Sequence, residues 1–352
     1  MSPPSGPPTG RSVTHGGLAV RLDDESPFET ALYGLVLPSG EEAVGLAVKG
    51  TWTVGDDGAC ALAPVQEPVR LVPEYVGEPG ASGLRYPADA TLPKPGTDCL
   101  LVAHAVAARP GARVVTVRFR VGPVQTTLVV FGERRWERLF GGARPSDPDP
   151  FERLPLVWEH AFGGTDPSPE READGERAVM NPVGTGFRAR RSRRPLAETP
   201  PPRIERFDAL VVSPDDRPPP GGTLPVSPDW APRVGRAGTF DEAWRRDRAP
   251  LLPDNFDPRF SCAAPDDLVA TPPLVGGEPV RVEGVRAEGP LAFSLPRVPL
   301  SARALMPTRT RQVDFGLSTV LVEAETPRVM MTWVGTIRLS GEPILAVCVW
   351  QP

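Results

Sequence analysis

Proline and glycine set the strongest limit on how this chain can fold. Of its 352 residues, 47 are proline and 35 are glycine. Proline removes a backbone N–H and glycine has no side chain to pack, so both are disfavoured in helix interiors and in central strands. Much of the backbone must therefore run as turns and loops. Hydrophobic residues still make up 40% of the chain, which is enough for a core and is unlike the composition of disordered proteins.

Hydrophobic alternation predicts β-strands toward both ends of the chain. Residues 44–54 alternate with a period of two and are expected to form a half-buried strand. Residues 99–131 are expected to form a three-stranded antiparallel meander. Later strands are predicted at 280–282, 291–295, 313–322, 329–339 and 344–350. Because no strand-helix alternation points to a parallel α/β fold, the sequence predicts a mainly β protein with antiparallel, sandwich-like sheets and a few short helices.

The middle of the chain differs from the ends in composition and in residue pattern. Seventeen prolines fall between Pro195 and Pro273, and no strand-like run there exceeds a few residues. Aromatic residues recur through this segment, so we expect ordered loops held by buried rings. One short helix is predicted, with Thr239 as N-cap and Glu242 completing a capping box. The predicted parts are a disordered tail (1–17), an N-terminal antiparallel β domain (18–140), a Pro- and aromatic-rich loop region (141–277) and C-terminal strands that pack with the rest (278–352).

Charge, hydropathy and cysteine content exclude several classes of protein. The net charge is −5 and acidic and basic residues are interleaved. The chain therefore has no positive electrostatic field that would attract nucleic acid or an anionic membrane. We find no export signal and no apolar stretch long enough to insert in a membrane, so a cytoplasmic location is expected. The four cysteines lack CxxC spacing, which argues against zinc and against a disulfide scaffold.

Few residues have the pattern of a reaction centre. His160 is the one plausible catalytic imidazole. A hydrolase would pair it with Cys262 or a serine and orient it with Glu159 or Asp166, but no nucleophile elbow is present. Gly163 and Gly164 are predicted to be turn glycines. Four acids could surround a cation, although their spacing fits no EF-hand: Asp254, Asp257, Asp266 and Asp267. We therefore predict no catalytic residue, no metal site and no cofactor. The hydrolase and a glycan-binding β-sandwich remain as alternatives.

Several blocks of the sequence resemble the bacterial domain-of-unknown-function family 2169, which is found beside type VI secretion genes. The blocks lie at 92–98, 132–136, 158–166, 181–187 and 230–266. Residues 202–205 and the pair Ser261-Cys262 depart from the family pattern. The resemblance implies an adaptor or chaperone without catalytic activity, whose partners are an effector toxin and the secretion spike protein.

Aromatic side chains are frequent anchors in protein interfaces. For an adaptor, the candidate partner-binding residues are therefore rings of the loop region: Trp158, Phe162, Phe187, Trp230, Trp244, Phe256 and Phe260.

Overall fold

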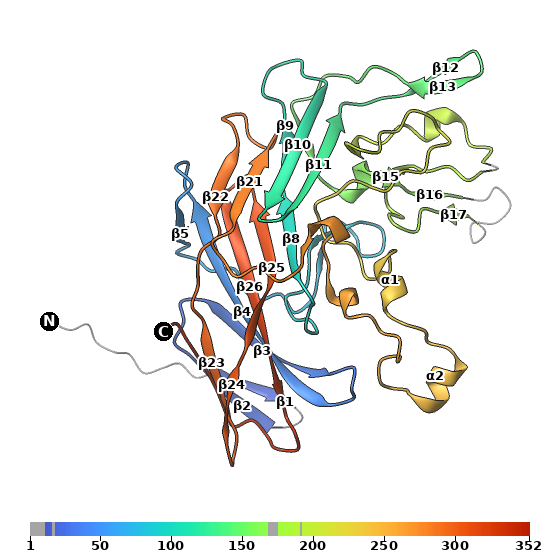
Figure 1. Cartoon of the computed structure of the whole chain (residues 1–352). Helices are drawn as coiled ribbons and strands as arrows, with labels where there is room; N and C mark the ends of the chain where they lie inside the picture. The colour runs from blue at the N-terminus through green and yellow to red at the C-terminus, as the bar shows by residue number, and fades with distance from the viewer. Residues whose placement is uncertain (1–10, 16–17, 168–174, 191) are drawn as a thin grey trace.

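The computed structural model describes residues 11–15, 18–167, 175–190 and 192–352. It confirms the mainly β architecture: three large sheets and several two-stranded ribbons account for most of the regular structure. Figure 1 shows the large sheets on one side of the molecule and the loop-rich segment on the other. We call residues 18–140 and 278–352 the frame, and residues 141–277 the arm.

A seven-stranded sheet forms the centre of the frame. It combines strands from both ends of the chain. Strand β8 runs parallel to β25, and all other neighbouring strands of the sheet are antiparallel. In spatial order the sheet contains β20 (Val269–Ala270), β8 (Thr97–Val102), β25 (Phe315–Glu323), β26 (Arg328–Arg338), β4 (Glu42–Val54) and β3 (Glu29–Val36), with β5 (Cys60–Leu62) paired to one end of β4.

The strand predicted at 44–54 is confirmed as β4, but it is buried on both faces rather than half-buried. Its polar residue Lys49 is buried because its ammonium donates a 2.8 Å hydrogen bond to Asp89. Asp89 also accepts hydrogen bonds from the Arg70 backbone N–H and the Thr332 hydroxyl. A loop between β5 and β8, tied by these bonds, thus covers a face that the alternation pattern assigned to solvent. This loop carries the short ribbon of β6 (Glu74–Tyr75) and β7 (Leu84–Tyr86).

The predicted three-stranded meander at 99–131 is wrong in one respect. Its second and third strands do form a hairpin, β10 (Val114–Val121) with β11 (Val124–Phe131). The first strand breaks at Ala103: β8 joins the seven-stranded sheet, whereas β9 (His104–Val106) pairs with β14 (Arg153–Pro155). The physical reason is that residues 99–101 are apolar on both faces, and such a strand is stable only inside a sheet covered on both sides.

The β10–β11 hairpin lies in a second large sheet, which is antiparallel throughout. Its order is β19 (Ile204–Arg206), β11, β10, β21 (Pro279–Glu283) and β22 (Leu291–Ser294). The third large sheet brings the two ends of the chain together, with β2 parallel to β27. Its order is β1 (Arg11–His15), β2 (Leu18–Asp24), β27 (Ala346–Trp350), β23 (Ser301–Leu305) and β24 (Thr310–Val313).

Two boundaries differ from the predictions. Strand β1 lies within the segment 1–17 for which the sequence predicts disorder, and residues 1–10 and 16–17 of that segment lie outside the described residues. The strand predicted at 313–322 is divided at Asp314 between β24 and β25, which belong to different sheets. The strands predicted at 280–282, 291–295, 329–339 and 344–350 are confirmed as β21, β22, β26 and β27.

The arm contains short elements connected by ordered loops. Two of its ribbons are β15 (Phe162–Gly163) with β18 (Thr185–Gly186) and β16 (Thr165–Asp166) with β17 (Glu176–Arg177); a third crosses its boundary with the frame and pairs β12 (Trp136–Leu139) with β13 (Gly142–Pro145). Its helical turns are η1 (Trp158–His160), η3 (Leu196–Glu198), α1 (Arg233–Arg236), α2 (Glu242–Asp247), η4 (Pro258–Ser261) and η5 (Asp266–Leu268). In the described part of the chain no helix is long and apolar enough to span a membrane.

Helix α2 is the one predicted from a capping box, but its N-cap is Asp241 rather than Thr239. The Asp241 carboxylate accepts a 2.8 Å hydrogen bond from the Trp244 backbone N–H. The Thr239 hydroxyl instead accepts from the side-chain amide of Asn255. A carboxylate is a good acceptor at a helix N-terminus and also suits its dipole.

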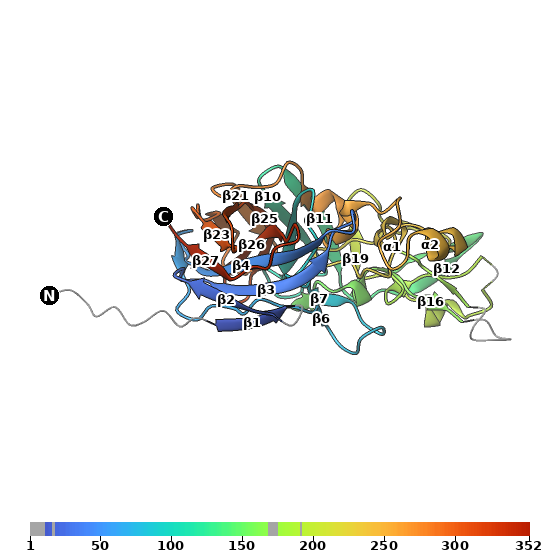
Figure 2. The same cartoon turned by 90° about the horizontal axis from the view of Figure 1, so that it is seen from below.

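Three short strands attach the arm to the frame, because β14, β19 and β20 each pair with a frame strand. Figure 2 shows the arm extending to one side of the sheets. The buried apolar side chains form one connected core that includes Leu46 and Phe119 of the frame and Trp158 and Trp230 of the arm. The arm is therefore a continuation of the folded body, although it is built mainly of loops.

Candidate functional site

The seven aromatic residues predicted to bind a partner hold the arm together instead of forming one surface. Trp158, Phe162 and Trp230 are buried, and the other four are half-buried. All seven take part in edge-on ring pairs, with ring centroids 6.1 Å apart for Trp158 and Trp230, 6.5 Å for Phe162 and Phe187, 5.9 Å for Phe256 and Phe260, and 4.8 Å for Trp244 and Phe240. The buried three expose too little surface to contact a partner, so their prediction as docking residues is corrected to a structural role.

The block that begins at Trp158 fastens several arm loops to one another. The Trp158 indole N–H donates to the Pro225 carbonyl at 2.9 Å. The side-chain amide of Asn181 donates to the carbonyls of Trp158 and Phe162. Gly164 has a φ of +108°, and a Cβ there would lie 2.6 Å from the Gly184 carbonyl oxygen. Glycine is thus required at this close backbone approach, as expected of a turn glycine.

The block at 92–98 contains a buried ion pair and joins the arm to the central sheet through hydrogen bonds. The Lys94 ammonium lies 2.6 Å from the Asp98 carboxylate, and both side chains are almost completely buried. Asp98 also accepts hydrogen bonds from the backbone N–H groups of Ala263 and Ala264. The Thr97 hydroxyl donates to the Leu317 carbonyl and accepts from the Leu274 N–H. This block therefore fixes the end of the arm against β8 and β25.

The block at 132–136 supplies a second buried ion pair, between Arg134 and Glu205. The Arg134 guanidinium also donates to the Pro202 carbonyl, and Glu205 accepts a 2.8 Å hydrogen bond from the Val211 N–H. Burial raises the pKa of Glu205, and the adjacent Arg134 opposes that shift. Residues 202–205, where this chain departs from the family pattern, thus still form a buried polar junction.

Of the two residues of the hydrolase alternative, Cys262 lies in an environment that disfavours its reactive form, the thiolate, and His160 is half-buried. Burial, and to a smaller extent the negative charge of Asp98, raises the pKa of the Cys262 thiol to about 11. The residue is only 1% exposed. Burial and the positive charge of Arg203 lower the pKa of half-buried His160. A cysteine nucleophile requires a thiolate, so the environment of Cys262 does not resemble that of the cysteine in an activated Cys-His pair.

The four acids considered as cation ligands are each engaged by a different arginine. Arg248 pairs with Asp254, Arg259 with Asp257, Arg236 with Asp266 and Arg206 with Asp267, at 2.5 to 3.2 Å. Asp257 also caps η4 by accepting a hydrogen bond from the Arg259 N–H. Their positions are explained by ion pairs and, for Asp257, by turn capping.

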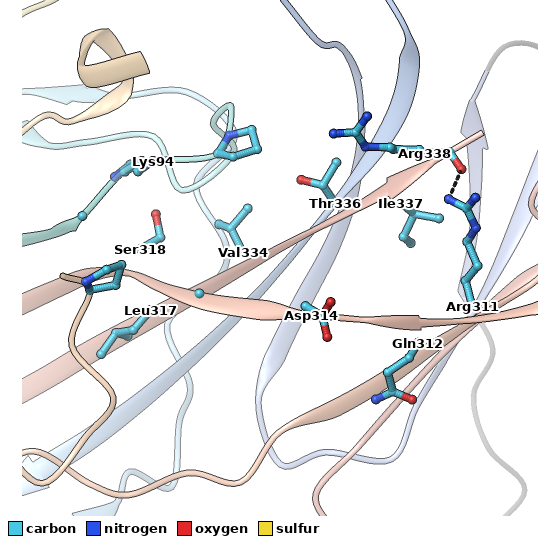
Figure 3. A pocket seen from close by; sticks show the side chains of 14 residues that line it. Lys94, Arg311, Gln312, Asp314, Leu317, Ser318, Val334, Thr336, Ile337 and Arg338 are labelled. Carbon is cyan, nitrogen blue, oxygen red and sulfur yellow. Dashed lines mark hydrogen bonds between the residues drawn. The ribbon is translucent and has the colours of Figure 1, made fainter. Parts of the chain in front are cut away.

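A groove of about 500 Å³ lies beside β26, where the chain passes at Asp314 from β24 in one sheet to β25 in another. Figure 3 shows Thr336 and Arg338 on one wall and Arg311 on the other, with the Arg311 guanidinium donating to the Arg338 carbonyl at 3.4 Å. Lys94 reaches the lining, but its ammonium is bound by Asp98 and Thr319. The lining contains no histidine or cysteine. The groove therefore offers mainly polar side chains, among them Arg311, Gln312 and Thr336, for contact with another molecule.

Exposed apolar side chains form a feature of the arm that the sequence analysis missed. Phe207, Leu210 and Val212 are 65%, 45% and 67% exposed. We call these three residues the apolar ridge. Between them, Val211 points inward and is 5% exposed. The signal in the sequence is the short apolar run 209–212 beside Phe207, but the run alone does not indicate which members face solvent.

Comparison with known proteins gives one family. No curated protein and no solved structure matches this sequence significantly. A family model described as an uncharacterized protein conserved in bacteria, DUF2169, matches residues 39–334. The match includes the fastening blocks around Lys94, Arg134 and Trp158 and spans most of the chain. The protein therefore belongs to the bacterial family DUF2169.

Proposed function

We propose that this protein is a cytoplasmic adaptor that binds an effector toxin and helps to load it on the spike protein of a type VI secretion apparatus, without chemistry of its own. The secretion role is drawn from the family resemblance of the sequence blocks. The general role, protein binding, is supported by a physical observation: a loop-built arm that is firmly fastened to a β frame and exposes an apolar ridge.

The apolar ridge is the main support for this proposal, because hydrogen bonds hold its backbone in one conformation. The Phe207 N–H donates to the Thr127 carbonyl of β11 at 3.1 Å. The N–H groups of Val211 and Val212 donate to the carboxylates of Glu205 and Asp216, both at 2.8 Å. A surface that is ordered before binding loses less conformational entropy on association. Burying three large apolar side chains then supplies the affinity.

The environments of the candidate catalytic groups support a binding role. The Cys262 thiol has a raised pKa and little exposure, and the groove beside β26 has no histidine or cysteine in its lining. The aromatic rings that a glycan-binding module would expose are largely engaged with one another in the arm.

The test is co-purification of the tagged protein with candidate effector and spike proteins from the same bacterium. The variant Phe207→Ser/Val212→Ser should retain less than a tenth of the effector, because residues central to an interface dominate its affinity. A matched control, Val65→Ser/Val72→Ser, alters frame residues that are 79% and 70% exposed. It should bind like the wild type.

Both variants should keep the thermal midpoint of the wild type, because the altered side chains are exposed. Equal effector retention by the ridge variant and the control would refute the ridge as a docking surface. A wild-type protein that retains neither effector nor spike would refute the adaptor function.

A further inference from the structure

The ribbon of β12 and β13 projects from the junction of frame and arm. Its strands pair from Trp136 with Pro145 to Leu139 with Gly142. The turn consists of Phe140 and Gly141, and Gly141 has a φ of +90°. Figure 1 shows the ribbon reaching beyond the large sheets. We call residues 136–145 the hairpin and residues 139–142 its tip.

The tip is apolar and uncovered. Phe140 is fully exposed, and Leu139 is 52% exposed. A Cβ built on Gly141 or Gly142 would have no atom within 4 Å, so the space around the tip is open. Adjacent exposed Phe and Leu side chains are unfavourable in water and are characteristic of surfaces that bind another molecule.

The base of the hairpin is held rigidly. The Trp136 indole N–H donates to the Thr199 carbonyl at 2.7 Å. Ser146 exchanges hydrogen bonds with the backbone of Arg135, donating from its N–H at 2.7 Å and accepting at its hydroxyl at 3.1 Å. The preceding residue, Arg134, is locked in the buried pair with Glu205. The family block at 132–136 thus orients a projection whose tip touches little of its own chain.

The same buried pair links the hairpin to the apolar ridge. Glu205 binds Arg134 with one carboxylate oxygen and the Val211 N–H with the other. The hairpin base and the ridge therefore have a fixed relative position, as two contacts for a single partner would require.

Charge indicates the chemistry of that partner. Arg138 and Arg144 flank the tip and are exposed, and Glu137 lies 3.5 Å from Arg144. The hairpin thus has a surplus of positive charge on a chain whose net charge is −5. Resting on the adaptor function proposed above, we infer that the hairpin inserts Leu139 and Phe140 into an apolar pocket on the effector, and that carboxylates on the rim of the pocket pair with Arg138 and Arg144.

The experiment measures the affinity of the purified full-length protein for the purified effector at low and at physiological salt. Leu139→Ala/Phe140→Ala should weaken binding about 30-fold, the effect expected of a central anchor. Arg138→Glu/Arg144→Glu should weaken binding and remove most of its dependence on salt, because attraction between exposed charges is screened by salt. The control Val65→Ala/Val72→Ala should bind like the wild type.

The outcomes separate the hairpin from the adaptor function. Affinities of tip variant and wild type within twofold of each other would overturn the hairpin inference and leave the adaptor function intact. A wild-type protein that binds no effector would refute the adaptor function and the hairpin inference with it. Loss of spike binding alone, or Phe140-dependent sedimentation with phosphatidylglycerol vesicles, would also overturn the inference, because the tip would then serve a different partner.

Discussion

Replacing Asp98 by asparagine should strongly destabilise the protein, although it changes only one atom of the side chain. Asp98 is fully buried, binds the Lys94 ammonium at 2.6 Å and accepts hydrogen bonds from two backbone N–H groups of the arm at 2.8 and 3.2 Å. Asparagine has the same shape, but its NH2 group cannot accept a hydrogen bond and it carries no charge to pair with Lys94.

The magnitude follows from the burial of both partners. Leaving one member of a buried ion pair without its partner costs about 3–5 kcal/mol, and an unsatisfied buried N–H adds about 1–3 kcal/mol. We therefore expect Asp98→Asn to lower the free energy of unfolding by about 4–8 kcal/mol. Lys94→Met should cost about 3 kcal/mol because it leaves the Asp98 charge buried. The double variant should cost clearly less than the sum, since no unpaired charge remains.

Urea denaturation at pH 7, followed by tryptophan fluorescence, measures the three variants against the wild type. Trp158 and Trp230 are suitable reporters because both are buried in the arm. A coupling free energy of about 2 kcal/mol or more between the two substitutions is expected. A coupling below about 0.5 kcal/mol would refute the conclusion that Lys94 and Asp98 form a strongly stabilising buried ion pair at the base of the arm.

Two further predictions concern the thiols and the histidine. In the native protein a maleimide should label the half-exposed thiols, Cys60 and Cys348, before the buried thiols, Cys99 and Cys262. Peptide mapping measures the order of labelling. Rapid labelling of Cys262 in the native protein would contradict its raised pKa and favour the hydrolase. Burial and Arg203 lower the pKa of folded His160 below its unfolded value near 6.5, so its contribution to stability is complete above that pH and is lost as the pH falls through the folded pKa. His160→Gln should therefore lose less unfolding free energy between pH 7 and pH 5 than the wild type does, and an equal loss would contradict this assignment.

The sequence predicted where the strands of the frame lie better than it predicted which strands pair with each other. Alternation located β4, β10 and β11 because each strand carries its own period of two. It could not show that β8 lies parallel to β25, because that pairing joins residues more than 200 positions apart. The burial of Lys49 on β4 was missed for the same reason, since its partner Asp89 comes from a distant loop.

The candidate site was predicted only in part. The sequence correctly indicated that aromatic rings order the Pro-rich segment, but it placed buried Trp158 and Trp230 on the docking surface. Composition cannot distinguish a ring that holds a loop from one that faces solvent. Phe140 and Phe207 were not chosen, because their exposure depends on where the hairpin and the ridge stand relative to the frame.

Hydrogen exchange of the protein, alone and with the effector, tests most directly whether the arm is a preformed docking surface. In the free protein, the amides of Leu101, Val211 and Ala263 should exchange slowly, since each donates to a partner that joins the arm to the frame or to another part of the arm. Adding effector should slow exchange in peptides covering 207–212 and 136–145 and leave 62–76 unchanged. Rapid exchange throughout the free arm, or protection confined to the frame, would contradict the account.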